Sequence, residues 1–522
     1  MDTKALRQKI LDLAIRGKLV PQDPKDEPAA VLLERIRAEK QRMVKDGKLK
    51  PKDIKNDTVI FKGDDNLHYE KFPDGTVKCI EDEIPFELPE GWSWTRLGSL
   101  FSTITGSTPS TKDASLYGDE YPFYKPTDLD AGFDVCVSED TVSEKGYKNG
   151  RILPMYSVLV TCIGATIGKT GYIKNSGICN QQINAILPNT FILPEYTYFC
   201  MCSEFEQQQI WTNSSATTLP ILNKSKFDIL FFPVPPKAQQ TRTVERIKEL
   251  LHFVEIIQQE KRTLQETIKL TKSKILDLAI RGKLVPQDPN DEPASVLLER
   301  IRSEKEELIK QGKIKRDKKE SVIFKGDDNS YYLRTGGVEE SLENWRFDDL
   351  PETWKICCLG ELCDYGDCIN VNTEDIAEDA WILDLEDIEK DTGMVLKKVT
   401  KAQRNSVSTK HKFHSGQVLY SKLRPYLNKV VLSDADGYCT SEILPLEFKN
   451  CVLPEYARYY LMSGTFITYA NHCSYGVKMP RLGTTDGKKA IFSLPPLSEQ
   501  KCIVETIDFC FMQLNKISEA LA

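Results

Sequence analysis

Two sets of polar and charged side chains occur in segments whose glycines and prolines predict turns. Arg can bind guanine through two hydrogen bonds, and Asn or Gln can bind adenine in the same way. Such side chains in exposed turns could therefore read the edges of bases. Ordinary turn or surface chemistry remains open for each residue. The first set is Thr105, Ser107, Thr108, Gln181, Gln182 and Thr217, and the second is Lys422, Arg424, Tyr426, Tyr475, Lys478 and Arg481.

Both sets lie in or near stretches without carboxylates. No Asp or Glu occurs in 145–194 or in 392–433, and the second stretch carries nine Lys or Arg residues. The whole chain is acidic, with a net charge of −7, so the global basic excess of many nucleic-acid binders is missing. Locally, however, lysines without acidic neighbours in sequence favour contact with phosphates. We therefore predict nucleic-acid contacts in these stretches, with four further candidates: Lys169, Lys397, Lys398 and Lys429.

The sequence lacks the patterns that indicate catalysis or metal binding. GATIGKT at 164–170 resembles a phosphate-binding loop, but its glycines enclose three residues and that motif needs four. We predict a strand–turn–strand hairpin there instead. The fifteen cysteines lack the paired spacing of a zinc site, and the chain has only five histidines. The sequence therefore predicts no catalytic residue and no metal site.

A duplication in the sequence indicates which elements position these side chains. Residues 9–40 and 274–305 differ at three of 32 positions, and three shorter motifs also recur. The inserts between the copies share little else, which indicates a pseudo-twofold scaffold that presents two different readers. A recent duplication without functional symmetry is the alternative. The recurring motifs are LPEGWSWTRLGSL and LPETWKICCLGEL, ILPEYTYFCMCS and VLPEYARYYLMS, and PPKAQQTRTVERI and PPLSEQKCIVETI.

A heptad-like apolar stripe without Pro or Gly predicts one long helix over 239–281. Gly282 stands where a helix cap is expected, and a second helix is predicted from Asp291-Glu292-Pro293 to Gly312. Residues 498–522 begin the same long helix, and Lys4–Arg16 supply its second half. The chain ends are thus expected to rebuild one copy of the central module, and the two long helices could pack antiparallel.

Each insert has the composition of an α/β domain. Residues 157–173 and 416–432 predict strands and turns, whereas 195–211 and 455–471 have helical spacing. Two basic stretches, KLKPKDIKND and KIKRDKKES, lead into a repeated VIFKGDDN. We interpret these stretches as solvated linkers first and as DNA contacts second.

The predicted fold class is α+β, with two α/β domains separated by long antiparallel coiled-coil helices in a pseudo-twofold, circular arrangement. No signal-peptide core and no run of 18 apolar residues occurs, so a cytoplasmic protein with reduced thiols and no membrane contact is expected. The expected segments are an N-terminal helical region at 1–50, a linker at 51–84, a first α/β domain at 85–237, a central helical region at 238–312, a linker at 313–347, a second α/β domain at 348–497 and a C-terminal helix at 498–522.

Together these motifs resemble the specificity subunits of type I restriction–modification enzymes over nearly the whole chain. The carriers are the duplicated KILDLAIRGKLVPQDP…DEPA module, the Gly-Ser-Thr-Pro turn at 106–109, the SKLRPYLNK segment at 421–429, the Leu-Pro-Glu-Tyr segments and the Pro-Pro junctions. The resemblance implies two target-recognition domains, each reading half of a split, asymmetric DNA sequence. It also implies that the coiled coil sets the spacing, and that this chain is not catalytic.

The resemblance further implies partners and places all cofactors on them. Two methyltransferase subunits, carrying S-adenosylmethionine, would dock on the helices, and motor–nuclease subunits with ATP and Mg would join the complex. Because recognition domains vary so much, the resemblance indicates zones rather than base-contacting residues, and Pro425 and Tyr426 are expected to be partly structural. A non-catalytic scaffold that tethers two partners without reading DNA is the alternative.

Overall fold

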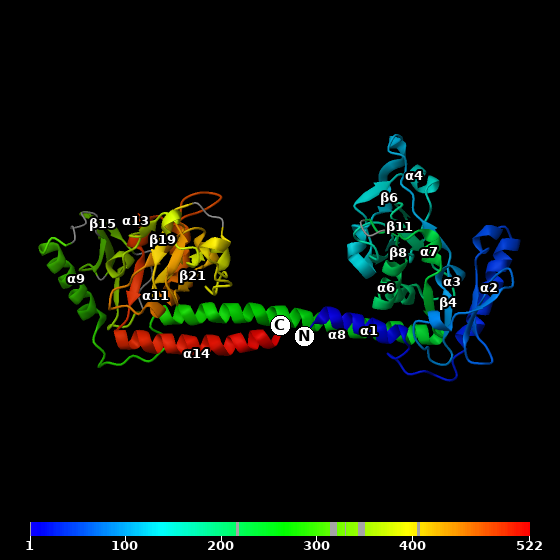
Figure 1. Ribbon diagram of the computed structural model, residues 1–522, viewed down its shortest axis with the longest axis horizontal. Coiled ribbons are helices and arrows are strands. Elements are labelled where there is room, and N and C mark those ends of the chain that lie inside the picture. The colour runs from blue at the N-terminus through cyan, green and yellow to red at the C-terminus, as the bar shows by residue number, and fades with distance from the viewer. Residues whose placement is uncertain are drawn as a thin grey trace. The chain divides into compact units, whose positions relative to one another are not determined.

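A computed structural model describes residues 2–215, 219–313, 321–328, 330–342, 350–404 and 408–521 (Figure 1). The chain combines helices with sheets and divides into two compact units, Met1–Glu260 and Lys261–Ala522. The boundary falls inside the longest helix, α8 (Lys237–Ile280). The long helix predicted over 239–281 is therefore confirmed.

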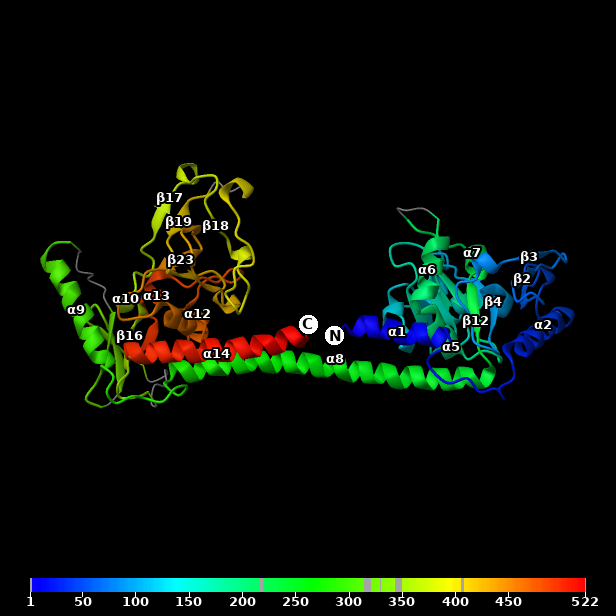
Figure 2. The same cartoon turned by 60° about the horizontal axis from the view of Figure 1, so that its bottom comes forward.

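Each unit has a helical frame built on its own part of α8 (Figure 2). In unit 1, α1 (Thr3–Ile15) runs antiparallel to α8, because Arg7 pairs with Glu255 whereas Asp26, after the helix, pairs with Arg242. In unit 2, α14 (Leu497–Leu521) runs antiparallel to the C-terminal part of α8. There Ser493 Oγ donates to the Ile280 carbonyl at 3.0 Å, and Lys272 Nζ donates to Asn515 Oδ1 at 2.5 Å. Antiparallel packing of the predicted helices is thus present within each unit.

Glycines end the repeated helices, as predicted. Gly17 and Gly282 have φ of +65° and +66°, a left-handed conformation that costs glycine least. A Cβ on either residue would lie 2.5 Å from the ring of Pro89 or Pro351, so close packing also requires glycine there. The chain then starts a second helix directly after Pro28 or Pro293, α2 (Ala29–Lys45) in unit 1 and α9 (Ala294–Lys310) in unit 2.

The insert of unit 1 folds as three sheets flanked by short helices. The strand orders are β12–β4, β5–β11–β8–β9 and β10–β6–β7, with β8 and β9 antiparallel around the predicted hairpin turn. Its elements are β4 (Ser93–Arg96), α3 (Leu97–Leu100), β5 (Thr103–Thr105), β6 (Tyr117–Tyr124), η4 (Asp128–Asp134), β7 (Asp140–Val142), α4 (Glu144–Asn149), β8 (Val158–Thr161), β9 (Thr170–Tyr172), β10 (Ile178–Cys179), β11 (Ile183–Ile186), α5 (Pro194–Met201), α6 (Glu204–Asn213), α7 (Lys224–Asp228) and β12 (Phe231–Val234).

The insert of unit 2 also folds as three sheets, but its strands are distributed differently among them. Its strand orders are β16–β24, β17–β19–β22–β18 and β21–β20–β23. Its elements are β16 (Lys355–Cys358), α10 (Leu359–Leu362), β17 (Ile369–Val371), β18 (Ile382–Leu383), β19 (Lys410–Phe413), β20 (Val418–Ser421), η8 (Pro425–Leu427), β21 (Val430–Leu432), β22 (Gly437–Thr440), β23 (Ile443–Leu446), α11 (Pro454–Leu461), α12 (Gly464–Cys473), α13 (Thr484–Lys489) and β24 (Ile491–Leu494).

Two features differ from the sequence-based expectation. Each segment with helical spacing is two helices, because Ser203 and Ser463 cap new helices with their hydroxyl groups. The stretches predicted as linkers contain small antiparallel sheets, although 314–320, most of the second basic stretch, lies outside the described residues. These sheets are β1 (Val59–Lys62), β2 (His68–Lys71) and β3 (Val77–Cys79) in unit 1, and β13 (Ser321–Lys325), β14 (Tyr331–Thr335) and β15 (Val338–Ser341) in unit 2.

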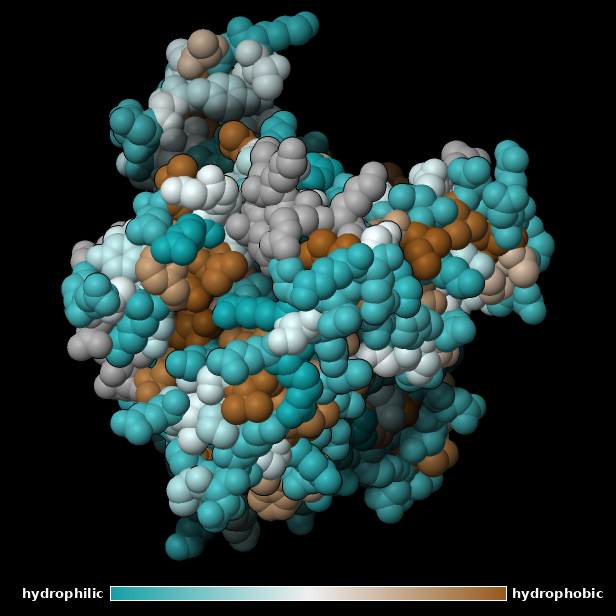
Figure 3. All heavy atoms as spheres, turned by 90° about the vertical axis from the view of Figure 1, so that its left-hand side faces the viewer, coloured by the Kyte–Doolittle hydropathy of each residue, from teal (hydrophilic) through white to brown (hydrophobic). Residues whose placement is uncertain are grey.

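Three further properties concern the surface, the helices and the cysteines. On the face in Figure 3, hydrophilic residues predominate and apolar residues form small separate patches. None of the described helices has the length and apolar character needed to cross a bilayer. All fifteen cysteines are free thiols.

One carboxyl group, Glu206 of α6, is completely buried in unit 1. Gln209 Nε2 donates to it at 3.0 Å, and the Cys200 thiol lies 3.8 Å away. Burial raises the pKa of Glu206 well above its ordinary value, so its neutral form is favoured. At the position 260 residues further on, unit 2 has Phe466, which is also buried.

We predict that Glu206→Gln removes a pH-dependent loss of stability. The folded chain holds the Glu206 proton more tightly than the unfolded chain does, so the free energy of unfolding falls as pH rises above about 4.5 towards the raised pKa. The slope from this single group is at most about 1.4 kcal/mol per pH unit. Urea unfolding at pH 5.5 and 8 should show a smaller difference between these pH values for the variant than for the wild type.

Glu195→Gln is the matched control, because Glu195 is partly exposed and pairs with Lys248 at 2.6 Å. It should leave the pH dependence nearly unchanged. Parallel pH profiles for wild type and Glu206→Gln would contradict the assignment of a neutral Glu206.

Candidate nucleic-acid interface

The candidate residues of unit 2 gather on three loops, which we call loop cluster 2: 422–428, 440–442 and 475–481. Main-chain bonds join the loops: Arg424 N donates to the Pro480 carbonyl at 2.7 Å, and Lys422 N donates to the Glu442 carbonyl at 3.0 Å. The fold therefore brings together six candidates that are up to 59 residues apart in sequence, namely Lys422, Arg424, Tyr426, Tyr475, Lys478 and Arg481.

Loop cluster 2 is held in a defined shape. Tyr475 and Arg481 exchange main-chain hydrogen bonds of 3.1 and 2.9 Å, which close the loop between them. The Arg481 guanidinium grips Glu442, with N–O distances of 3.0–3.2 Å. Arg424 adopts a left-handed conformation with φ of +50°, and within the described chain its buried Nε has no hydrogen-bond partner. Arg481 thus fastens the loop, whereas Arg424 retains an unsatisfied donor.

Candidates of unit 1 form an equivalent group, loop cluster 1, made of 105–109, 162–164, 180–182 and 219–221. Ser107 N donates to the Cys179 carbonyl at 2.8 Å, and Thr108 Oγ1 donates to Gln181 Oε1 at 2.5 Å. A Cβ at Gly106 would lie 2.0 Å from the Asn180 carbonyl oxygen, which explains the glycine of the Gly-Ser-Thr-Pro turn. The cluster brings together Thr105, Ser107, Thr108, Gln181 and Gln182, and Thr217 lies outside the described residues.

The two loop clusters share a main-chain frame but differ in side chains. Gly164 N donates to the Pro220 carbonyl at 3.0 Å, the counterpart of the Arg424–Pro480 bond at an offset of 260 residues. Side chains on this frame change character, since Gln182 corresponds to Glu442 and Ile221 corresponds to Arg481. The sequence analysis missed this correspondence. The offset of 260 residues, applied to every position of the inserts, would have identified it.

Four candidate lysines lie outside the two loop clusters, and in the folded chain three of them lie beside carboxylates. Lys169 pairs with Asp130 at 2.7 Å, Lys398 with Asp434 at 2.7 Å, and Lys397 approaches Asp387 at 3.6 Å. Each carboxylate lies outside the acid-free stretch in sequence, so the sequence alone could not reveal the pairing. By contrast, Lys422 and Lys478 have no ion-pair partner in the part of the chain that the structure describes.

Lys429 has a different role. Its ammonium donates to the Leu385 carbonyl at 2.5 Å, and burial lowers the pKa of this group. Lys429 therefore ties β21 to the segment after β18, and its location does not suggest an open phosphate contact.

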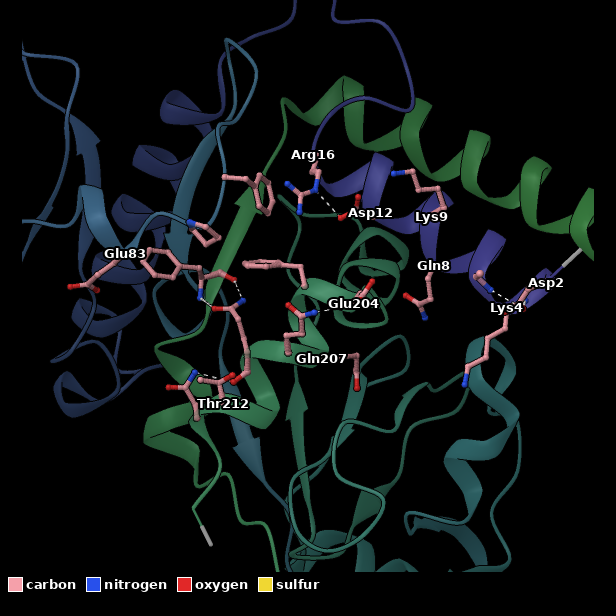
Figure 4. Close-up of a pocket in the computed structure, with 18 residues that line it drawn as sticks. Asp2, Lys4, Gln8, Lys9, Asp12, Arg16, Glu83, Glu204, Gln207 and Thr212 are labelled. Atoms are coloured by element: carbon pink, nitrogen blue, oxygen red, sulfur yellow. Dashed lines mark hydrogen bonds and ion pairs between the residues drawn. The ribbon is translucent and has the colours of Figure 1, made fainter. Parts of the chain in front are cut away.

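A hollow of about 1020 Å³ lies between α1 and α6 of unit 1. In Figure 4, Gln8 and Asp12 on α1 and Arg16 at its C-terminal cap lie across from Glu204 and Gln207 on α6. Arg16 donates to Asp12 at 2.7 Å, and its guanidinium lies 4.2 Å from the centre of the Phe86 ring. No Ser, Cys or His is among the described residues that line this hollow, so it contains neither the Ser–His nor the Cys–His pair of nucleophilic catalysis.

Cysteines near loop cluster 1 are unsuited to nucleophilic chemistry. Burial raises the pKa of the Cys162 and Cys179 thiols to about 12, so both stay protonated near neutral pH. In the described ranges, no group of three or more His, Cys, Asp or Glu side chains is arranged to hold a metal ion. What the loop clusters offer is hydrogen bonding and charge.

Both units match one family model, described as the type I restriction modification DNA specificity domain, at residues 89–266 and 351–520. The chain is 27% identical to the specificity subunit of the type I restriction enzyme EcoAI of Escherichia coli, covering 98% of this chain and 90% of that protein. It is 29% identical to the EcoEI specificity subunit of Escherichia coli, covering 69% and 61%.

A solved structure from work on complex assembly and conformational transition of the type I R-M system also resembles this chain. It aligns with a TM-score of 0.53 and 16% identity, covering 84% of this chain and 94% of that chain. At this level of identity the likeness concerns the fold.

We predict that Glu442→Ala loosens the 475–481 loop. Loss of the partly exposed Arg481–Glu442 pair should increase local opening about two- to five-fold, the range expected for such a pair. Limited proteolysis with trypsin, followed by mass spectrometry, should show faster cleavage after Lys478 and Arg481. Asp434→Ala, which breaks the Lys398 pair elsewhere in the unit, is the control and should not change cleavage at these two sites. Equal rates for wild type and Glu442→Ala would show that the pair does not hold the loop.

Proposed function

Because the chain belongs to the type I restriction–modification DNA specificity family, we propose that each unit reads one half of a bipartite DNA target through its loop cluster. The chain is the DNA-recognition subunit of such a system and is not itself an enzyme. The single observation that carries the proposal is the shared main-chain frame with different side chains at its loops. Equal frames can approach DNA in equivalent ways, while unlike side chains select different bases.

The polar set of loop cluster 1 suits direct reading of base edges. Gln181 is exposed and Gln182 is partly exposed, and their amide groups can donate and accept hydrogen bonds. Thr108 Oγ1 fixes the Gln181 side chain, which reduces the conformational freedom lost on binding. In loop cluster 2, the cations Lys422, Arg424 and Lys478 suit phosphates or guanine.

The duplicated helical module supports a proposal about partners. Several residues of this module are exposed in both units and identical between them, although surface positions rarely need a particular residue for folding. Val31 and its counterpart Val296 are 36% and 39% exposed, and Glu34 and Glu299 are both exposed. We assign this repeated surface to two copies of one partner, the methyltransferase subunit, through which motor–nuclease subunits join the complex.

In this proposal all cofactors stay on the partners, S-adenosylmethionine on the methyltransferase and ATP with Mg on the motor–nuclease. Helix α8, which continues across the boundary between the units, is assigned the role of spacer between half-sites. The complex would act on DNA in the cytoplasm, where the free thiols would remain reduced.

We predict that Lys422→Ala and Lys478→Ala each weaken DNA binding about five- to ten-fold near 0.1 M salt. Each lysine lacks an ion-pair partner in the described chain, so its charge is available for a phosphate, and its loss should reduce the salt slope of log Kd by about one. Fluorescence anisotropy with the methyltransferase-bound chain would measure both quantities.

Lys398→Ala is the matched control, because Asp434 already neutralises Lys398 locally. It should change affinity less than two-fold. If all three variants bind like the wild type, loop cluster 2 does not contact DNA, and a scaffold that reads no sequence becomes the better account.

We predict that replacing residues 85–237 with the corresponding insert of another family member changes one half of the target and leaves the other half intact. Equivalent hydrogen bonds hold the insert in both units, since Trp92 and Trp354 donate to Gln239 and Glu499, and the Leu193 and Leu453 N–H groups donate to Gln240 and Gln500. The new reader should therefore fold independently of unit 2. Sequencing of methylated bases in DNA modified by the chimeric complex would reveal both halves. A change in both halves would contradict separate reading.

A further inference from the structure

The loop from Tyr475 to Arg481 ends in an exposed apolar tip. Val477 is fully exposed, and Tyr475 and Met479 are 62% and 43% exposed. Single exposed apolar side chains are common on proteins, whereas exposed apolar side chains that cluster in one patch are typical of interaction sites. The tip therefore calls for a partner that can cover apolar atoms.

Hydrogen bonds and one ion pair within the chain hold this tip in place. Main-chain hydrogen bonds between Tyr475 and Arg481 close the loop, and the Arg481–Glu442 pair fastens its base. Gly476 has φ of +96°, which permits the sharp turn that projects Val477. A pre-formed tip loses little conformational entropy on binding, which favours a recognition role.

The cationic and aromatic side chains around the tip indicate which kind of partner it fits. Lys478 is exposed beside Val477. The neighbouring loop, 422–428, carries Lys422 and also Tyr426, which is 50% exposed. A surface with an apolar centre and cations around it complements a DNA groove, where base edges lie between two rows of phosphates. In the major groove the apolar group of a base edge is the C5-methyl of thymine.

The corresponding segment of unit 1 has a different sequence. At the offset of 260 residues, Thr217 and Thr218 replace Val477 and Lys478, while Pro220 corresponds to Pro480. The two inserts therefore differ in residue type at these positions, as expected if each insert reads different bases.

We propose that Val477 contacts the methyl group of one thymine in the half-site read by unit 2, with Tyr475 and Met479 shielding that contact from water. The inference rests on the proposed function and adds a specificity-determining residue to it. Val477 is short and branched at Cβ, so it has few conformations to lose and suits a methyl contact. Side chains that wedge between base steps are usually larger.

The test uses the complete chain with its methyltransferase partner and duplexes carrying the target sequence, as read from methylated DNA. Each thymine of both half-sites is replaced in turn by deoxyuridine, which lacks only the methyl group, and Kd is measured by anisotropy. We expect one position in the half-site of unit 2 to weaken binding about three- to five-fold, as loss of one buried methyl implies. Val477→Ser should bind more weakly and no longer distinguish thymine from deoxyuridine there.

Two variants control for general effects. Val477→Ile keeps an apolar branched tip and should retain the thymine preference. Val338→Ser removes another exposed valine of unit 2, on β15, and should change neither affinity nor the deoxyuridine profile.

Two outcomes overturn the inference. Either deoxyuridine has no effect in that half-site, or Val477→Ser keeps the wild-type deoxyuridine profile. In the second case, a change in DNA bending, measured by energy transfer between labelled ends, would identify Val477 as a wedge between base steps. Failure of the proposed function is distinct, because the wild-type complex would then bind target and scrambled duplexes equally.

Discussion

In each unit a buried tryptophan donates a hydrogen bond to the start of one long helix, α8 in unit 1 and α14 in unit 2, which we call the frame helix. The rest of the structure depends on this contact. Trp92 Nε1 donates to Gln22 Oε1 at 2.9 Å and to Gln239 Oε1 at 3.1 Å, and Trp354 Nε1 donates to Glu499 Oε2 at 2.9 Å. A buried indole N–H without a partner costs about 1–3 kcal/mol. Each unit therefore needs the Leu-Pro-Glu-x-Trp segment and the start of the frame helix in a single relative position.

The next residue of each frame helix fixes the other side of the insert. Gln240 Oε1 and Gln500 Oε1 accept the main-chain N–H groups of Leu193 and Leu453, both at 2.8 Å. Since these leucines begin the Leu-Pro-Glu-Tyr segments, all three recurring motifs meet at one junction in each unit. The junction holds the ends of the insert and leaves its distant loops free to vary. This arrangement separates the frame, which holds the insert, from the loops, to which we assign specificity.

The loop clusters show the same separation on a smaller scale. Their shape depends largely on main-chain hydrogen bonds, such as Gly164 to Pro220 and Arg424 to Pro480, which tolerate different side chains. The side chains then make each cluster different. Arg481 with Glu442 fastens one loop, while the counterparts of this pair, Ile221 and Gln182, are uncharged. Charge follows a similar division, because Lys169, Lys397 and Lys398 pair with carboxylates, whereas Lys422 and Lys478 have no ion-pair partner among the described residues.

The sequence by itself determined the elements and their repetition. The apolar stripe of α8, the glycines at 17 and 282, and the two Pro-Pro junctions are local signals, and local propensity and spacing are sufficient to interpret them. The small sheets at 59–79 and 321–341 were missed because their strands are short and half-exposed, so they lack a clear alternation. The breaks at Ser203 and Ser463 were missed because capping depends on side-chain geometry.

Only the tertiary structure decided which candidate side chains stand together and which charges remain available. Asp130, Asp387 and Asp434 lie outside the acid-free stretches in sequence, yet the fold brings each to a lysine. Arg481, which looks like a base-reading cation in sequence, pairs with Glu442, whereas Val477, which lies in the same predicted turn but was not singled out, is fully exposed at the loop tip. Electrostatic pairing and exposure depend on distances in space, and spacing along a chain does not specify those distances.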